Sequence, residues 1–125
     1  MNRLAMMEAM DDYYWRMAAR GRCFHIQTPG GPGTCTFFIL SSEQQLPQFH
    51  QRSYWSIPDD DPHGTIVYID KLVVPQFDIH LWRQIERAFD THVSKWMQAI
   101  WYRPGQGADR RYHYRRRMVR HGANL

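Results

Sequence analysis

Long hydrophobic runs are absent from this chain of 125 residues. The longest purely apolar stretches, such as residues 37–40, contain only a few residues, whereas a helix that crosses a bilayer needs about 20. No basic region followed by an apolar stretch opens the sequence, so it predicts no signal peptide. We therefore expect a protein without a membrane span that resides in the cytoplasm.

Cysteine is scarce, and Cys23 and Cys35 are the only two. They flank a Gly/Pro-rich turn, and a hairpin closed by that turn would let them face each other. Neither has an obvious base beside it, which argues against a catalytic thiol. The interpretation we favour is a pair of reduced, partly buried thiols.

Acidic residues are nearly missing from the last part of the chain. Residues 103–125 contain seven Arg and one Asp, whereas residues 1–102 contain nine Lys or Arg and eleven Asp or Glu. The formal net charge of +4 therefore combines a mildly acidic body with a strongly basic end. Such an end suggests an anionic partner, with a solvated helix face as the alternative.

The composition is that of one globular domain. Apolar residues make up 43% of the chain, and five Trp, seven Tyr and six Phe supply large side chains for a core. Hydrophobic periodicity and turn signals predict alternating helices and strands. We expect a helix at residues 3–20, strands at 23–28, 34–41, 65–74 and 96–102, a short helical turn near 43–49, and a helix that begins after Asp78.

Two polar loops invite a functional interpretation. Residues 29–33 are rich in glycine, but their two prolines lack the N–H groups that a phosphate-binding loop needs. Residues 59–64 contain three carboxylates and a histidine, but consecutive residues in an extended turn point in different directions. We favour a hairpin turn for the first loop and an acidic surface turn, rather than a metal site, for the second.

The basic segment at residues 109–121 is compatible with a strand or a helix. Tyrosines alternate with basic residues, which allows a strand, but Asp109 suits a helix N-terminus and Gly122 suits a helix end. We expect a helix. Its side chains suit contact with nucleic acid, with an acidic protein, or with other subunits of a larger assembly. The residues that we expect to contact a partner are Arg110, Arg111, Tyr112, Tyr114, Arg115, Arg116, Arg117 and Arg120.

The order of expected elements resembles the GNAT superfamily of N-acetyltransferases. In that fold the central strand ends in a splayed position, acyl-CoA lies against it, and the next helix begins at the pyrophosphate. The matching pieces are residues 65–74 for the strand and 78–92 for the helix. The resemblance implies an α+β fold, a mixed β-sheet with flanking helices in a single compact domain over residues 1–125.

Two branches of the superfamily are more similar. Residues 68–75 resemble a strand of the lysine acyltransferases that activate RTX toxins, which implies a catalytic role for Asp70 and leaves His25 as the candidate for the family's catalytic histidine. Residues 118–123 resemble a helix end in GNAT-like internal virion proteins of phages. That second likeness implies a non-catalytic accessory protein in the host cytoplasm or the virion.

The first likeness implies a donor bound as a thioester. The backbone of Leu72, Val73 and Val74 would hold the donor arm, and the donor would be acyl-CoA or acyl carrier protein. Residues 75–80 lack the glycines of the superfamily's pyrophosphate loop, and they place Asp78 where a phosphate would lie. This departure favours a carrier-protein donor, or no donor at all, over acyl-CoA.

Asp70 is the one carboxylate inside an apolar strand. Burial would raise its pKa, and a carboxylate with a raised pKa suits a general base. An ion pair with an arginine is an equally good interpretation. Strand alternation places Asp70 and Lys71 on opposite faces of the sheet, so we expect them not to act together.

Overall fold

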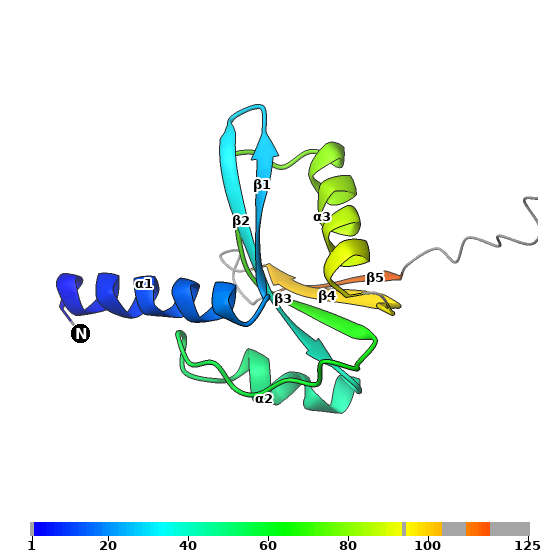
Figure 1. Cartoon of the computed structure of the whole chain (residues 1–125), viewed down its shortest axis with the longest axis horizontal. Coiled ribbons are helices and arrows are strands. Elements are labelled where there is room, and N and C mark those ends of the chain that lie inside the picture. Colours follow the sequence, from blue (N-terminus) through cyan, green and yellow to red (C-terminus); the bar gives the residue numbers. More distant parts are fainter. Residues whose placement is uncertain (1, 94, 104–109, 116–125) are drawn as a thin grey trace, which may run out of the picture.

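The computed structural model describes residues 2–93, 95–103 and 110–115, which fold into one small α+β domain (Figure 1). A five-stranded sheet runs in the order β1-β2-β3-β4-β5. Three α-helices and one 3₁₀ turn accompany it. In chain order the elements are α1 (Arg3–Ala19), β1 (Cys23–Thr28), β2 (Gly31–Leu40), η1 (Glu43–Gln45), α2 (Leu46–His50), β3 (Ile66–Val73), α3 (Ile79–His92), β4 (Gln98–Arg103) and β5 (Arg110–Arg115).

The sheet is mixed. Strands β1, β2 and β3 pair antiparallel, β3 and β4 pair parallel, and β4 and β5 pair antiparallel. The predicted hairpin is therefore confirmed, and the β3–α3–β4 unit places its two strands side by side in parallel. Parallel neighbours need a crossover between them, which α3 supplies.

Helices cover both faces of the sheet (Figure 1). On one face, Leu81, Ile85 and Phe89 of α3 pack into a cluster with side chains of all four strands β1 to β4. On the other face, Tyr13 and Met17 of α1 join a second cluster with α2 and the strands β2 to β4. Only the second half of α1 contributes these buried residues, and its first half projects from the body.

The helix boundaries follow from capping groups. Asn2 Oδ1 accepts from Ala5 N–H at 2.8 Å at the start of α1, and Gly21 follows its end with a φ of 71°. Asp78 Oδ1 accepts from Leu81 N–H at 2.9 Å, which confirms the predicted cap of α3. These caps satisfy backbone groups that helices leave without internal partners.

The expected C-terminal helix is wrong where the structure describes it. Residues Arg110–Arg115 form the edge strand β5, and each pairs with a residue of β4, from Gln98↔Arg115 to Arg103↔Arg110. The ladder to β4 pairs the backbone groups that face β4 and overrides the local helix signals of the segment. The remaining positions of the expected helix, 109 and 116–121, lie outside the described residues.

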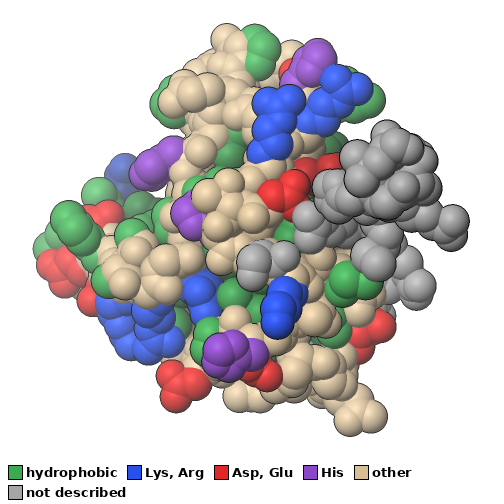
Figure 2. Space-filling model, turned by 45° about the vertical axis from the view of Figure 1, so that its right-hand side comes forward, with side chains coloured by type: hydrophobic (Ala, Val, Ile, Leu, Met, Phe, Trp, Pro, Cys, Tyr) green, Lys and Arg blue, Asp and Glu red, His purple; other side chains and the backbone are tan. Residues whose placement is uncertain are grey.

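No helix within the described ranges is long and apolar enough to cross a membrane. Acidic, basic and apolar side chains are interspersed on the face shown in Figure 2. Among the described side chains of that face, neither sign of charge dominates.

The approach of Gly64 to the end of β2 demands a glycine. A Cβ atom at this position would lie 2.2 Å from the Leu40 carbonyl oxygen. At Gly30, by contrast, the nearest atom is a side-chain carbon of Pro75 at 3.3 Å. The loop before β3 is therefore held against backbone at Gly64, whereas the β1–β2 turn meets a side chain at Gly30.

Gly64→Ala is expected to lower the free energy of unfolding by about 1–3 kcal/mol, because backbone must shift to admit the methyl group. Gly30→Ala should cost less, since a side chain is easier to displace. Urea denaturation of both variants measures the difference. Equal stability of Gly64→Ala and wild type would contradict the close approach.

Candidate functional site

A β-bulge interrupts the pairing of β2 with β3. Thr36 pairs with Lys71 and Phe37 pairs with Ile69, so Asp70 is an extra residue in β3. The extra residue shifts the alternation of side chains along β3. As a result, Ile69 and Leu72, which are three positions apart, both pack toward α3. The side chains between them, Asp70 and Lys71, both contact Tyr13 of α1 on the other face. The expectation that they lie on opposite faces is therefore wrong, because a bulge adds one residue to a strict two-residue period.

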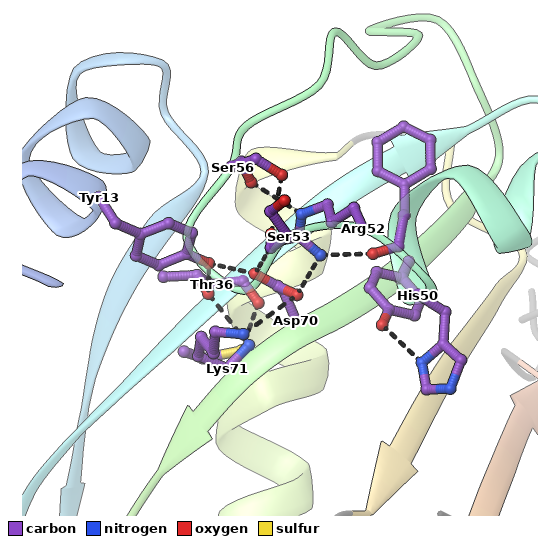
Figure 3. Close-up of polar contacts among 11 residues, drawn as sticks. Tyr13, Thr36, His50, Arg52, Ser53, Ser56, Asp70 and Lys71 are labelled. Atoms are coloured by element: carbon purple, nitrogen blue, oxygen red, sulfur yellow. Dashed lines mark hydrogen bonds and ion pairs between the residues drawn. The ribbon is translucent and has the colours of Figure 1, made fainter. Parts of the chain in front are cut away.

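The Asp70 carboxylate is buried and doubly paired with Arg52. Arg52 Nη1 donates to Asp70 Oδ1 at 2.9 Å, and Nη2 donates to Oδ2 at 2.6 Å. The Asp70 side chain is 2% exposed and the Arg52 side chain 9%. The Tyr13 hydroxyl also donates to Oδ2 (Figure 3). Both oxygens are thus engaged, as the ion-pair interpretation requires, with an arginine from the segment after α2.

Backbone carbonyls fix the orientation of Arg52. Its Nε donates to the Ser56 carbonyl at 2.7 Å, and Nη1 donates to the Phe49 carbonyl. The guanidinium lies 5.0 Å from the Phe38 ring centroid. The residues from the end of α2 to Ser56 therefore wrap around one cation, which presents its planar fork to Asp70.

A chain of hydroxyl groups connects the bulge to α1. The Lys71 N–H donates to Thr36 Oγ1 at 3.1 Å, and Thr36 Oγ1 lies 2.6 Å from the Tyr13 hydroxyl oxygen. The single proton of Tyr13 goes to Asp70, so Thr36 is the donor to Tyr13. Burial, followed by the charge of Asp70, raises the pKa of Tyr13 above its ordinary value. Tyr13 therefore stays a neutral donor.

Lys71 lies among aromatic rings beside this carboxylate. Its Nζ is 3.8 Å from Asp70 Oδ1 and 3.6 Å from the centroid of the Tyr54 ring. The rings of Trp55 and Tyr13 lie within 6 Å of it. Burial lowers the pKa of Lys71, the nearby Arg52 charge lowers it further, and the Asp70 charge opposes both. The amine is thus easier to deprotonate than an ordinary lysine.

A cavity opens where β3 and β4 part. Their pairing runs only from Ile66↔Gln98 to Ile69↔Trp101, and beyond it lies a cavity of about 310 Å³. Arg52, Asp70, Lys71, Leu72 and Val73 are among its lining residues. Three of the residues expected from sequence, Asp70, Leu72 and Val73, thus meet at one cavity, whereas Val74 packs toward the α3 cluster.

The histidine of this cavity is His50, at the end of α2. Its Nδ1 lies 3.2 Å from the Tyr68 hydroxyl, and its ring stacks on Tyr102 with centroids 3.8 Å apart. The candidate from sequence, His25, lines a neighbouring groove instead, with its Nδ1 3.5 Å from Thr34 Oγ1. His25 was predicted because of its position near the N-terminus of the chain. No local sequence pattern distinguished His50 or Arg52 as residues of a site.

The start of α3 is occupied by its own carboxylate. Asp78 accepts from the first turn, and Phe77 stacks on Trp101 with ring centroids 5.7 Å apart. An anion at this helix N-terminus would meet the Asp78 charge. The segment after β3 therefore supports the cavity-lining Trp101 from behind and offers no phosphate cradle at the start of α3.

The remaining polar candidates lie elsewhere. Asp60 of the acidic loop accepts from Arg22 Nε at 2.8 Å and from Ile39 N–H at 2.7 Å, so it anchors that loop to β2. Among the described residues, no group of three potential ligands lies close enough to hold a metal ion. Of the expected partner-binding positions, Arg110 to Arg115 belong to β5, and Arg116, Arg117 and Arg120 lie outside the described residues.

The two thiols are separate and free. Cys35 is buried in the α3 cluster, and Cys23 borders the cluster on the opposite face. Burial raises the pKa of both thiols. Neither is therefore poised as a nucleophile, in agreement with the interpretation as reduced structural cysteines.

Comparison of the chain with protein-family models, with curated proteins and with solved structures finds no match.

Arg52→Met is expected to lower the free energy of unfolding by about 3–5 kcal/mol, because it leaves the Asp70 charge buried without a counter-ion. Asp70→Leu in the same chain should recover much of that loss. Arg16→Met removes an exposed pair with Asp12 and should cost about 1 kcal/mol at most. Chemical denaturation compares the three, and equal losses for Arg52→Met and Arg16→Met would contradict the buried pair.

Proposed function

We propose that this chain is a GNAT-like, acyltransferase-type protein that moves an acyl group from a thioester to an amine. The observation that carries the proposal is the cavity at the point where β3 and β4 separate. An antiparallel β1–β2–β3 unit, followed by a helix and the parallel strand β4, supports the GNAT-like topology. The bulge in β3 supports a functional role, since bulges often re-aim side chains beside active sites.

The strand edge beside the cavity suits a thioester. Leu72 and Val73 line the cavity, and the β3–β4 ladder ends before them. Peptide groups on a strand edge without a ladder partner bind an extended, amide-containing arm as a further strand would. A thioester at the end of such an arm would lie near Asp70 and Lys71, at the inner end of the cavity.

His50 is the base in this proposal. Its ring lines the cavity, and its stacking on Tyr102 fixes the plane of the imidazole. A neutral imidazole can accept a proton from an attacking amine. Arg52 and Tyr13 hold the oxygens of Asp70. Asp70 therefore contributes a fixed negative charge to the cavity and does not act as the base by itself.

The donor is an acyl carrier protein rather than acyl-CoA. The Asp78 carboxylate caps α3 where a pyrophosphate would otherwise find backbone N–H groups. A carrier protein presents the same thioester arm and keeps its single phosphate outside. An acidic carrier would also suit the arginine-rich end of the chain.

The test is a thioester-dependent transfer assay on the full chain. Acyl carrier protein and acyl-CoA of the same chain length serve as donors, and lysine-containing peptides serve as acceptors. His50→Gln should lower turnover by about 100-fold or more, since base catalysis contributes that much. Asp70→Asn should also lower it. His25→Gln is the matched control outside the cavity and should keep wild-type turnover.

Two results would sink the proposal. One is the absence of transfer from either donor by wild-type protein. The other is turnover in His50→Gln that equals that of His25→Gln. Circular dichroism of each variant separates a lost base from a lost fold.

A second candidate function is favoured by the position of β5. We propose as the alternative that the chain is a non-catalytic accessory or virion protein whose arginine-rich end binds nucleic acid or a partner protein. The arginines of this segment begin on an edge strand of the sheet, a place open to a partner. Arginine and tyrosine in one segment suit phosphate contact and base stacking.

Nucleic-acid binding predicts a steep dependence on salt. The logarithm of the binding constant for single-stranded DNA should fall linearly with the logarithm of salt concentration, with a slope of about 0.7 per phosphate contacted. Fluorescence anisotropy with Arg115→Gln, Arg116→Gln and Arg117→Gln combined measures the change in slope. An unchanged slope would contradict nucleic-acid contact by these arginines.

A further inference from the structure

Lysine is rare in this chain, and its two lysines lie in different settings. Lys71 lines the cavity beside Asp70, whereas Lys95 is exposed after α3. Histidine aside, the other basic side chains of the sequence are arginines. Guanidinium groups do not act as nucleophiles at neutral pH, because they stay protonated. Lys71 is therefore the amine of the cavity.

The geometry holds the Lys71 amine at the cavity wall. The bulge turns its side chain to the same face as Asp70, and the rings of Tyr54, Trp55 and Tyr13 surround it. The side chain is 12% exposed, so most of its length is buried while the amine still lines the cavity. Arg52, on the far side of Asp70, adds a second positive charge nearby.

These neighbours act on the charge of the amine in opposite directions. Burial has the largest effect and lowers the pKa of Lys71; the Asp70 charge raises it, the Arg52 charge lowers it, and the net shift is downward. A lysine buried beside another cation has a larger neutral fraction at pH 7 to 8 than an exposed one, and only the neutral amine attacks a carbonyl carbon.

We propose that Lys71 accepts an acyl group from a thioester bound in the cavity, so that the protein acylates itself at this position. The inference rests on the proposed function, and it names an acceptor inside the chain. The carbonyl carbon lies within reach of the amine if the thioester arm follows the edge of Leu72 and Val73, because Lys71 precedes these residues in β3.

The reaction balances without a further reactant. The neutral Lys71 Nζ attacks the thioester carbonyl carbon, an N–C bond forms, and the C–S bond breaks. The proton that the amine loses goes to the departing thiolate by way of His50 or water. The products are an amide at Lys71 and a free thiol. No group is oxidised or reduced.

Acylation would change the cavity in two ways. The amide carries no charge, so the Lys71 contacts with Asp70 and with the Tyr54 ring lose their electrostatic part, and Arg52 remains as the counter-ion of Asp70. The acyl group itself would occupy part of the 310 Å³ cavity. Self-acylation would therefore limit further entry of donor.

The test uses a small thioester that carries no phosphate, acetyl-N-acetylcysteamine, with the full folded chain. Intact mass and peptide mapping locate the acetyl group over time. We expect Lys71 to be acetylated faster than Lys95, although Lys95 is more exposed. Lys71→Arg should abolish the adduct while keeping the charge, and Lys95→Arg should leave it unchanged. Unfolding in urea should remove the preference.

Equal labelling of the two lysines in the folded chain would overturn the inference, as would labelling in the Lys71→Arg variant at the wild-type rate. The result also separates this inference from the proposed function. Transfer to a peptide acceptor without an adduct at Lys71 keeps the proposed function and removes the inference. An adduct at Lys71 without transfer to any peptide keeps the inference and removes the proposed function.

Discussion

The ion pair of Asp70 with Arg52 is the constraint on which the rest of the site depends. A carboxylate in a central strand that is buried on both faces must be paired and hydrogen-bonded, because an isolated buried charge costs several kcal/mol. Arg52 meets that demand with two hydrogen bonds, and Tyr13 adds a third. Because these partners come from α1 and from the segment after α2, one carboxylate ties both elements to the same face of the sheet. The loop that carries Arg52 also forms one wall of the cavity.

The bulge in β3 converts that structural pair into a chemical site. Without the extra residue, Lys71 would point toward the α3 cluster, where its charge would have no partner. With it, the amine and the carboxylate share one side, and a buried Thr36 hydroxyl accepts the Lys71 N–H at the point of the bulge. The pairing of β3 with β4 ends at Ile69, the residue directly before this irregularity. A strand that both bulges and loses its neighbour within a few residues creates a cavity and brings polar groups to its wall.

Much of the fold was predictable, and the site was predictable only in part. Strong periodic segments, such as α3 with its Asp78 cap and the β-branched run of β3, follow from local sequence. The strand β5 did not, because its pairing with β4 is a tertiary effect that local signals cannot report. Asp70, Leu72 and Val73, which the sequence singled out, line one cavity. Lys71 was assigned to the wrong face because a bulge has no clear signature in a run of apolar residues, and His50 and Arg52 reach the cavity only through the path of the chain after β2.

The central claim is that Asp70 and Lys71 share one face of β3. Nuclear Overhauser contacts of the Lys71 side chain in lysine-labelled protein test it most directly, and the presence of only two lysines makes the assignment simple. The account predicts contacts from the Lys71 Hε protons to the ring protons of Tyr54 and Tyr13, with upfield shifts caused by those rings. Contacts from Lys71 to Leu81 or Trp82 of α3 instead, without such shifts, would contradict it.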